Sequence, residues 1–172
     1  MSVSKHNFYK QAKIMLKLGF KSVNLKDIFN DKSKKKFVIT FDDGYQDVFT
    51  NAYPILKELN LKATCFFVIN KIGKYNEWDS NKSDYKKRNI MNEGQMLQWY
   101  ESGLEVGSHS LDHDNLIKVS DTKKKEQIVM SNLRRLTAEN MVNEFVNTLP
   151  EASYASPIGR RRSDDTTKRA ND

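Results

Sequence analysis

The chain has 172 residues, 38% of them hydrophobic, and 29 basic against 22 acidic residues give a formal net charge of +7. This length suits one domain with a single core. No apolar stretch approaches the roughly 20 residues that a membrane span needs, and we expect no signal peptide because Met1 to Lys13 lacks an apolar segment. One cysteine, Cys65, excludes an internal disulfide. These features do not indicate the cellular compartment.

Helices and strands alternate along the sequence. Ser4 can cap the first helix, Gly19 can end it, and Asn92 with Gln95 resembles a capping box. In chain order, the predicted elements are a helix over 4–18, an extended piece over 23–25, a strand over 37–41, a helix over 54–59, a strand over 63–68, a helix over 92–102, a strand over 104–107, a helix over 121–146 that could break near Thr137, and a strand over 152–155.

This alternation predicts parallel β-α units and therefore an α/β fold. Residues 71–91 are polar and irregular, so a long surface loop is predicted there. We expect one domain over residues 1–159 and a polar, basic tail over 160–172.

Two motifs carry the chemistry. Thr40-Phe41-Asp42-Asp43-Gly44 follows an apolar run, and Ser108-His109-Ser110-Leu111-Asp112-His113 follows the strand predicted over 104–107. Ligands gather beyond the carboxyl ends of parallel strands, where both motifs are expected to lie. A catalytic zinc site uses three imidazole or carboxylate ligands and leaves a position for water. The two histidines, four residues apart, would share one side of a helical turn, and one carboxylate would remain as a general base.

Each motif also has a simpler interpretation. Asp-Asp-Gly is by itself a common turn, and paired histidines are often ordinary surface or core residues. The basic excess concentrates in clusters that could attract nucleic acid or an acidic glycan, although solvated loops and helix faces are the favoured interpretation. These clusters cover residues 32–36, 86–88, 123–125 and 160–162. No motif favours a nucleic-acid partner.

The two motifs resemble those of the polysaccharide deacetylase family, carbohydrate esterases that remove acetyl groups from N-acetylated glycans. Residues 63–68 and 103–108 are also similar to the family, and residues 154–159 resemble a degraded third motif. The resemblance implies an incomplete, distorted (β/α) barrel. It implies that Asp42 is the base, that Asp43, His109 and His113 hold a divalent metal, with zinc the expected ion, and that the backbone N–H of Ile158 binds the oxyanion.

The sequence also departs from the family pattern. Ala155 stands where many members have an arginine that orients the base, and Ile158 replaces a tyrosine. The family's later motifs, including the histidine that acts as general acid, have no counterpart. We therefore expect weak or absent deacetylase activity and marginal stability or dependence on a partner. The alternative is a catalytically impaired relative that binds glycan or metal. The glycan, the native metal and the oligomeric state are not determined.

Overall fold

The computed structural model describes residues 3–148, with side chains described for residues 3–135. The α/β fold is confirmed. A parallel three-stranded sheet has the order β3 (Thr40–Phe41), β4 (Thr64–Phe67), β5 (Glu105–Ser108), and β1 (Lys21–Ser22) pairs in parallel with β2 (Lys36–Phe37) in a second sheet. Within residues 3–148 the strands do not close into a barrel.

The single strand predicted over 37–41 is wrong, because the chain changes partners within it. The carbonyl of Phe37 accepts a hydrogen bond from the backbone N–H of Val23 at 3.1 Å, in the β1–β2 sheet. The carbonyl of Ile39 accepts from Thr64 at 2.9 Å, which already belongs to the β3–β4 pair. The extended run therefore divides into β2 and β3, and β1 lies just before the extended piece predicted over 23–25.

The predicted helix ends agree well with the structure. Helix α1 spans Lys5–Lys17, α2 spans Tyr53–Glu58, and α3 spans Glu93–Glu101. The Ser4 hydroxyl accepts from the N–H of Asn7 at 3.2 Å. At α3 both bonds of the Asn92–Gln95 capping box form, at 2.9 and 3.0 Å. Shorter helical segments are η1 (Leu25–Asp27), the π-helical η2 (Val48–Ala52), η3 (Ile69–Lys71) and η4 (Glu77–Asp79).

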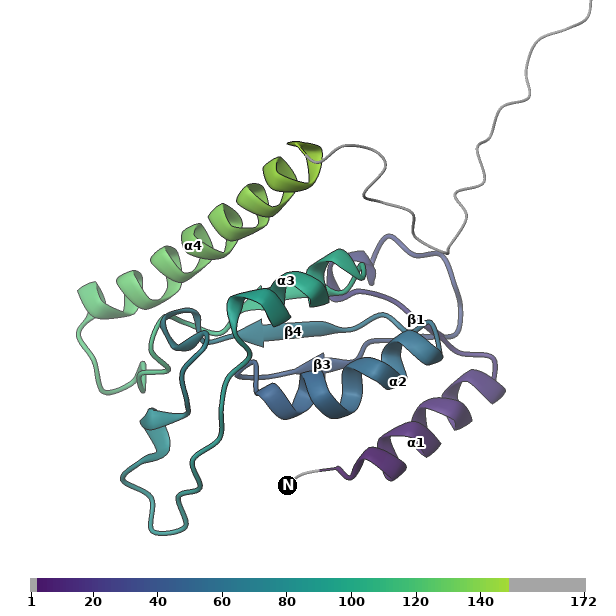
Figure 1. Cartoon of the computed structure of the whole chain (residues 1–172), viewed down its shortest axis with the longest axis horizontal. Coiled ribbons are helices and arrows are strands. Elements are labelled where there is room, and N and C mark those ends of the chain that lie inside the picture. Colours follow the sequence, from purple (N-terminus) through teal and green to yellow (C-terminus); the bar gives the residue numbers. More distant parts are fainter. Residues whose placement is uncertain (1–2, 149–172) are drawn as a thin grey trace, which may run out of the picture.

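The core lies between the three-stranded sheet and these helices. Figure 1 shows α2 in front of β3 and α3 next to β4, with α1 on the side of α2 away from α3. Trp99 of α3 is fully buried, donates from its indole N–H to the carbonyl of Glu105 at 3.0 Å, and meets the ring of Phe41 edge-on. Phe67 and Cys65 of β4 are also fully buried. This packing fixes the strand ends from which the two motifs emerge.

Helix α4 (Asp121–Thr148) is set apart from the other helices in Figure 1 and packs against β5 and η3. It runs without a break at Thr137. The strand predicted over 152–155, the third motif and the tail from residue 160 lie outside the described residues. No helix in the described part of the chain is long and apolar enough to cross a membrane.

Candidate metal centre

Asp43 reaches the site because the chain turns sharply after β3. Both Asp43 and Gly44 have positive φ, 69° and 75°, a conformation that aspartate tolerates better than most residues and that glycine adopts freely. At Gly44 the backbone also passes close to β4, since an added Cβ would lie 2.5 Å from the Phe67 ring. The Asp-Asp-Gly motif is therefore a tight turn that also aims a carboxylate.

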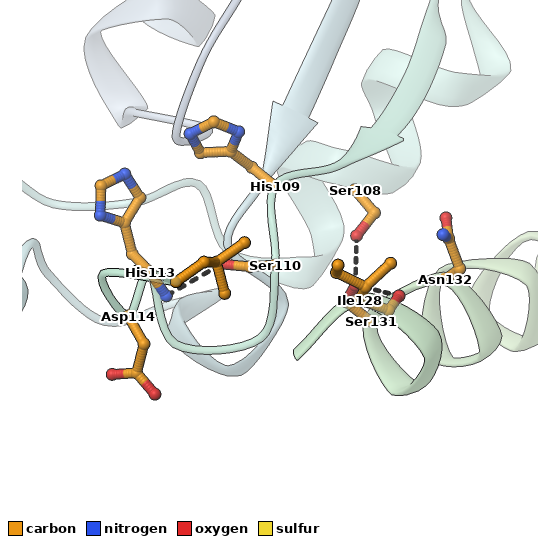
Figure 2. Close-up of a pocket in the computed structure, with 9 residues that line it drawn as sticks. Ser108, His109, Ser110, His113, Asp114, Ile128, Ser131 and Asn132 are labelled. Carbon is orange, nitrogen blue, oxygen red and sulfur yellow. Dashed lines mark hydrogen bonds between the residues drawn. The ribbon is translucent and has the colours of Figure 1, made fainter. Parts of the chain in front are cut away.

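The two histidines lie on the loop that follows β5. The N–H of His109 still donates to the carbonyl of Phe67 at 2.8 Å, as a continuation of the sheet. The next four residues do not form the helical turn that their spacing suggested. Instead, Ser110 and His113 have φ of 66° and 65°, and the Ser110 hydroxyl accepts from the N–H of His113 at 3.1 Å. Figure 2 shows both rings on one side of this loop.

Asp43, His109 and His113 meet in space. The Oδ1 atom of Asp43 lies 3.4 Å from Nε2 of each histidine. One ligand atom from each of the three residues lies within 4.8 Å of the other two, so the group could hold a metal ion. The same Oδ1 atom is buried and has no hydrogen-bond partner among the described residues. A buried carboxylate oxygen without such a partner, facing two imidazoles, fits a cation between the three side chains.

The electrostatics of the three groups agree with this geometry. Burial raises the pKa of Asp43, but the imidazole of His113, with that of His109, outweighs burial and holds the pKa below its usual value. The contact with Asp43 in turn raises the pKa of His113, although burial opposes it. Both shifts have one cause, the attraction between the Asp43 carboxylate and a protonated imidazole beside it.

Aromatic residues flank the histidines, and the sequence did not assign them this role. The Trp78 ring in η4 stacks on His113, with centroids 4.7 Å apart and planes 22° from parallel. Tyr45 lies next to Trp78 and carries Arg88 over its ring. The only signal in the sequence is a lone tryptophan in a polar loop. Arg88 also forms an ion pair with Asp47 at 2.6 Å. One positive charge of the basic cluster at 86–88 is therefore paired with an acidic residue of the same chain.

The other two predicted site residues are not tested by this geometry. Asp42 directly precedes Asp43, and its side chain is exposed. Ile158 lies outside the described residues. A hollow of about 270 Å³ opens between the histidine loop and α4. Figure 2 shows this hollow, which is lined by Ser108, His109, Ser110, His113, Asp114, Leu116, Ile128, Ser131 and Asn132.

Comparison with known proteins identifies the family of this chain. The family model described as polysaccharide deacetylase matches residues 29–171. The chain belongs to the polysaccharide deacetylase family. It is 30% identical over 166 residues to YxkH of Bacillus subtilis (strain 168), covering 93% of this chain and 52% of that protein. The predicted family resemblance is confirmed.

Two further relatives extend the comparison. The poly-β-1,6-N-acetyl-D-glucosamine N-deacetylase of Staphylococcus epidermidis is 31% identical over 128 residues, covering 71% of this chain and 42% of that protein. The structure of the Streptococcus pyogenes deacetylase PplD, in complex with acetate, matches with a TM-score of 0.67 at 22% identity, covering 80% of this chain and 59% of that one. This last likeness concerns the fold alone. The chain spans about half or less of the length of these two curated relatives.

Proposed function

We propose that this polysaccharide deacetylase family member hydrolyses acetamide groups of an N-acetylated polysaccharide with the help of a divalent metal ion. The chemistry of the donor set favours zinc as this ion. The observation that carries the proposal is the convergence of Asp43, His109 and His113 around a buried oxygen that has no hydrogen-bond partner in the part of the chain that the structure describes. Two imidazoles and one carboxylate are a common zinc donor set, which leaves a further position for water or substrate.

Asp43, His109 and His113 would hold the ion. When bound, it would supply a water activated for attack at neutral pH and a Lewis acid for the acetyl carbonyl. Asp42 is the proposed general base, because it adjoins Asp43 in the same turn and is exposed to solvent, where it could take the proton of the attacking water. Attack on the carbonyl carbon breaks the C–N bond, and the amine nitrogen takes up a proton. The products are acetate and a free amino sugar.

The proposed substrate class follows from the relatives and from the surroundings of the site. The name of the Staphylococcus epidermidis relative specifies a polymer of N-acetyl-D-glucosamine. Beside the histidines, Trp78 offers an aromatic surface of the kind that packs against sugar rings, and the hollow next to α4 is open to solvent. We propose an N-acetylglucosamine polymer as substrate, with Ile158 in the oxyanion role that the family motif implies.

Acetate release from N-acetylglucosamine oligomers tests this proposal. The full chain is freed of metal with a chelator, reloaded with zinc, and compared with Asp42→Asn prepared identically. We expect slow acetate release that requires the metal and that is lost in Asp42→Asn, because a general base contributes about 10²–10⁴-fold to the rate. Zinc-loaded protein that releases no acetate, or release that is equal in Asp42→Asn, would contradict the proposed hydrolysis.

The second candidate is a relative that binds metal and glycan without turnover. The specific observation that favours it is a departure within the sequence itself: Ala155 stands where many family members have an arginine that orients the base. The same assay separates the two candidates. A binder retains zinc and oligosaccharide but yields no acetate, whereas the enzyme yields acetate in proportion to its metal content.

A further inference from the structure

A buried glutamine on α4 holds the loop between the two histidines. Gln127 is fully buried, although it lies on a helix whose neighbouring positions are mostly charged or exposed. Its Oε1 accepts from the backbone N–H groups of Leu111 and Asp112, at 3.1 and 2.9 Å. Its Nε2 donates to Oδ2 of Asp112 at 2.9 Å. One side chain thus makes three hydrogen bonds to two consecutive residues.

These two residues lie between the candidate ligands. The loop from His109 to His113 contains two non-glycine residues with positive φ, Ser110 and His113. Such conformations are sparsely populated and persist only where surrounding contacts stabilise them. The hydrogen bond from the Leu111 N–H to Gln127 is buried, so losing it would remove the partner of a buried donor, which is unfavourable. The hydrogen bonds from α4 therefore offset the strain in the loop.

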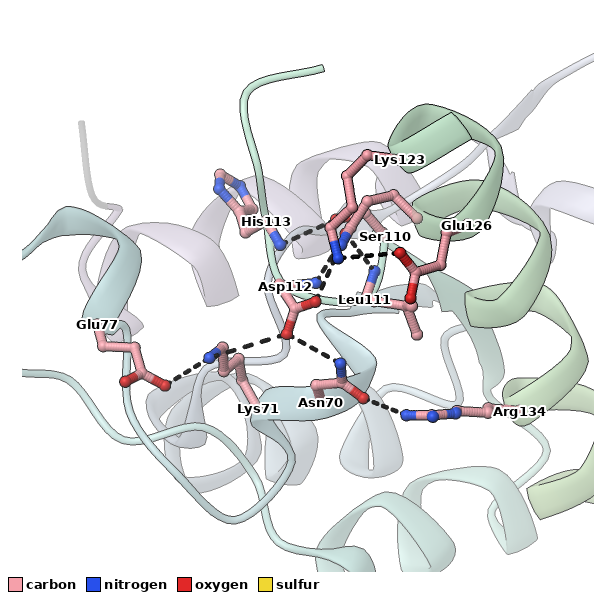
Figure 3. A network of polar contacts seen from close by, with 11 residues as sticks. Asn70, Lys71, Glu77, Ser110, Leu111, Asp112, His113, Lys123, Glu126 and Arg134 are labelled. Atoms are coloured by element: carbon pink, nitrogen blue, oxygen red, sulfur yellow. Dashed lines mark hydrogen bonds and ion pairs between the residues drawn. The ribbon is translucent and has the colours of Figure 1, made fainter. Parts of the chain in front are cut away.

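Asp112 connects this arrangement to the opposite side of the loop. Its Oδ1 accepts from the side-chain amide of Asn70 at 2.9 Å, and Lys71 lies 3.9 Å away. The side-chain oxygen of Asn70, Oδ1, accepts from the guanidinium of Arg134 of α4. Figure 3 shows Asp112 at the centre of this network, with η3 on one side and α4 on the other. The loop is thus held by two elements that contribute no metal ligand.

We propose that Gln127 is a positioning residue, which fixes His109 and His113 in the arrangement that binds the metal. The inference rests on the metal site of the proposed function and extends it to α4. Gln127 does not touch the donor atoms. It acts through the backbone of Leu111 and Asp112, so its loss lowers metal affinity by letting the two imidazoles move apart.

The test compares Gln127→Leu with Ser22→Ala in the full chain. Leucine has a similar size but no hydrogen-bonding atoms. Ser22 is a matched control, because it is also a buried polar side chain that accepts from a backbone N–H, that of Lys62 at 2.7 Å, and it lies outside the histidine loop and the hollow. Zinc affinity is measured by competition with a chromophoric chelator. We expect Gln127→Leu to weaken zinc binding roughly 10–100-fold, whereas Ser22→Ala leaves it unchanged.

A second pair of variants separates positioning from packing. Gln127→Glu keeps both acceptor contacts but sets a carboxylate against Asp112, and adding Asp112→Asn restores a donor between the two side chains. We expect the single variant to bind zinc more weakly than wild type and the double variant to regain most of the affinity. If Gln127 only filled space, the single and double variants would bind alike.

Hydrogen exchange of the metal-free protein gives a readout that does not depend on zinc. The N–H groups of Leu111 and Asp112 should exchange faster in Gln127→Leu than in Ser22→Ala. Unchanged zinc affinity in Gln127→Leu would overturn the inference and leave the metal site intact. If that variant does not fold, equal affinity in the Gln127→Glu single and double variants would overturn it. A wild-type chain that binds no zinc would overturn the metal site itself, and this inference with it.

Discussion

The Oδ1 atom of Asp43 and the Nε2 atom of His113 lie 3.4 Å apart, although one residue follows β3 and the other follows β5. The parallel order β3-β4-β5 brings both strand ends to the same edge of the sheet. His109 completes the group at the same distance from the carboxylate. The candidate centre is therefore a consequence of the sheet topology together with two sharp turns.

The two aspartates of the turn should have different roles. We expect Asp43→Asn to weaken zinc binding by about 1–3 kcal/mol, because a charged ligand becomes neutral. Asp42→Asn should leave zinc affinity nearly intact and remove acetate release. Parallel zinc titrations and acetate assays of the two variants measure this. If both variants lose zinc to the same extent, the division of roles is wrong.

Gly44 should tolerate no side chain. In Gly44→Ala, the positive φ and the approach of Cβ to Phe67 at 2.5 Å both act against the native turn. We expect a loss of about 2–4 kcal/mol in the free energy of unfolding. Gly94→Ala is the control. Gly94 lies inside α3 without a positive φ, and a Cβ added there would meet its nearest neighbouring atom, Oδ1 of Asn92, at 3.5 Å. Urea unfolding curves that coincide for the two variants would contradict the prediction.

Trp78 should stabilise the orientation of His113. Its stacked ring restricts the imidazole, and such ring pairs contribute about 0.5–1.5 kcal/mol beyond area burial. We expect Trp78→Leu to weaken zinc binding several-fold and Trp78→Phe to retain most of it, because phenylalanine keeps an aromatic face. Zinc titration of the two variants distinguishes stacking from simple bulk. Equal losses in both would exclude a stacking role.

Cys65 should be unreactive in the folded chain. Burial, with the negative charges of Asp42 and Asp43, raises the pKa of its thiol, so the thiolate is scarce at neutral pH. We expect an aromatic disulfide reagent to label no thiol in native protein and one thiol per chain after denaturation. The absorbance of the aromatic thiolate released by the reagent measures the labelling of native and of denatured protein. Rapid labelling of the native chain would show that β4 opens.

The parts of the fold set by local signals could be predicted from the sequence. The Asn92–Gln95 capping box and the Ser4 cap formed as their residue types suggested. The proximity of Asp43, His109 and His113 could also be predicted, because motifs that follow neighbouring parallel strands meet at one edge. Their role as metal ligands, which the family resemblance implied, stays a prediction. The division of residues 37–41 into two strands could not be predicted, since the partner of each residue depends on tertiary pairing.

The histidine loop shows the same limit. Its spacing suggested a helical turn, whereas the positive φ of Ser110 and His113 depends on contacts made elsewhere. Gln127 supplies several of these contacts from a helix that reads as largely exposed. A polar residue on such a helix gives no signal that distinguishes a buried hydrogen-bonding role from a solvated one. The hydrogen bonds of Gln127 depend on how the loop packs against α4, which the local sequence does not specify.

The most direct test of the account is the zinc content of the full chain. Equilibrium dialysis against zinc, followed by elemental analysis, is carried out on wild type and on the His109→Ala, His113→Ala double variant. The account predicts about one equivalent of zinc per wild-type chain and its loss from the double variant, with both proteins folded by circular dichroism. Zinc binding that is undiminished in the double variant would contradict the assignment of the metal to Asp43, His109 and His113.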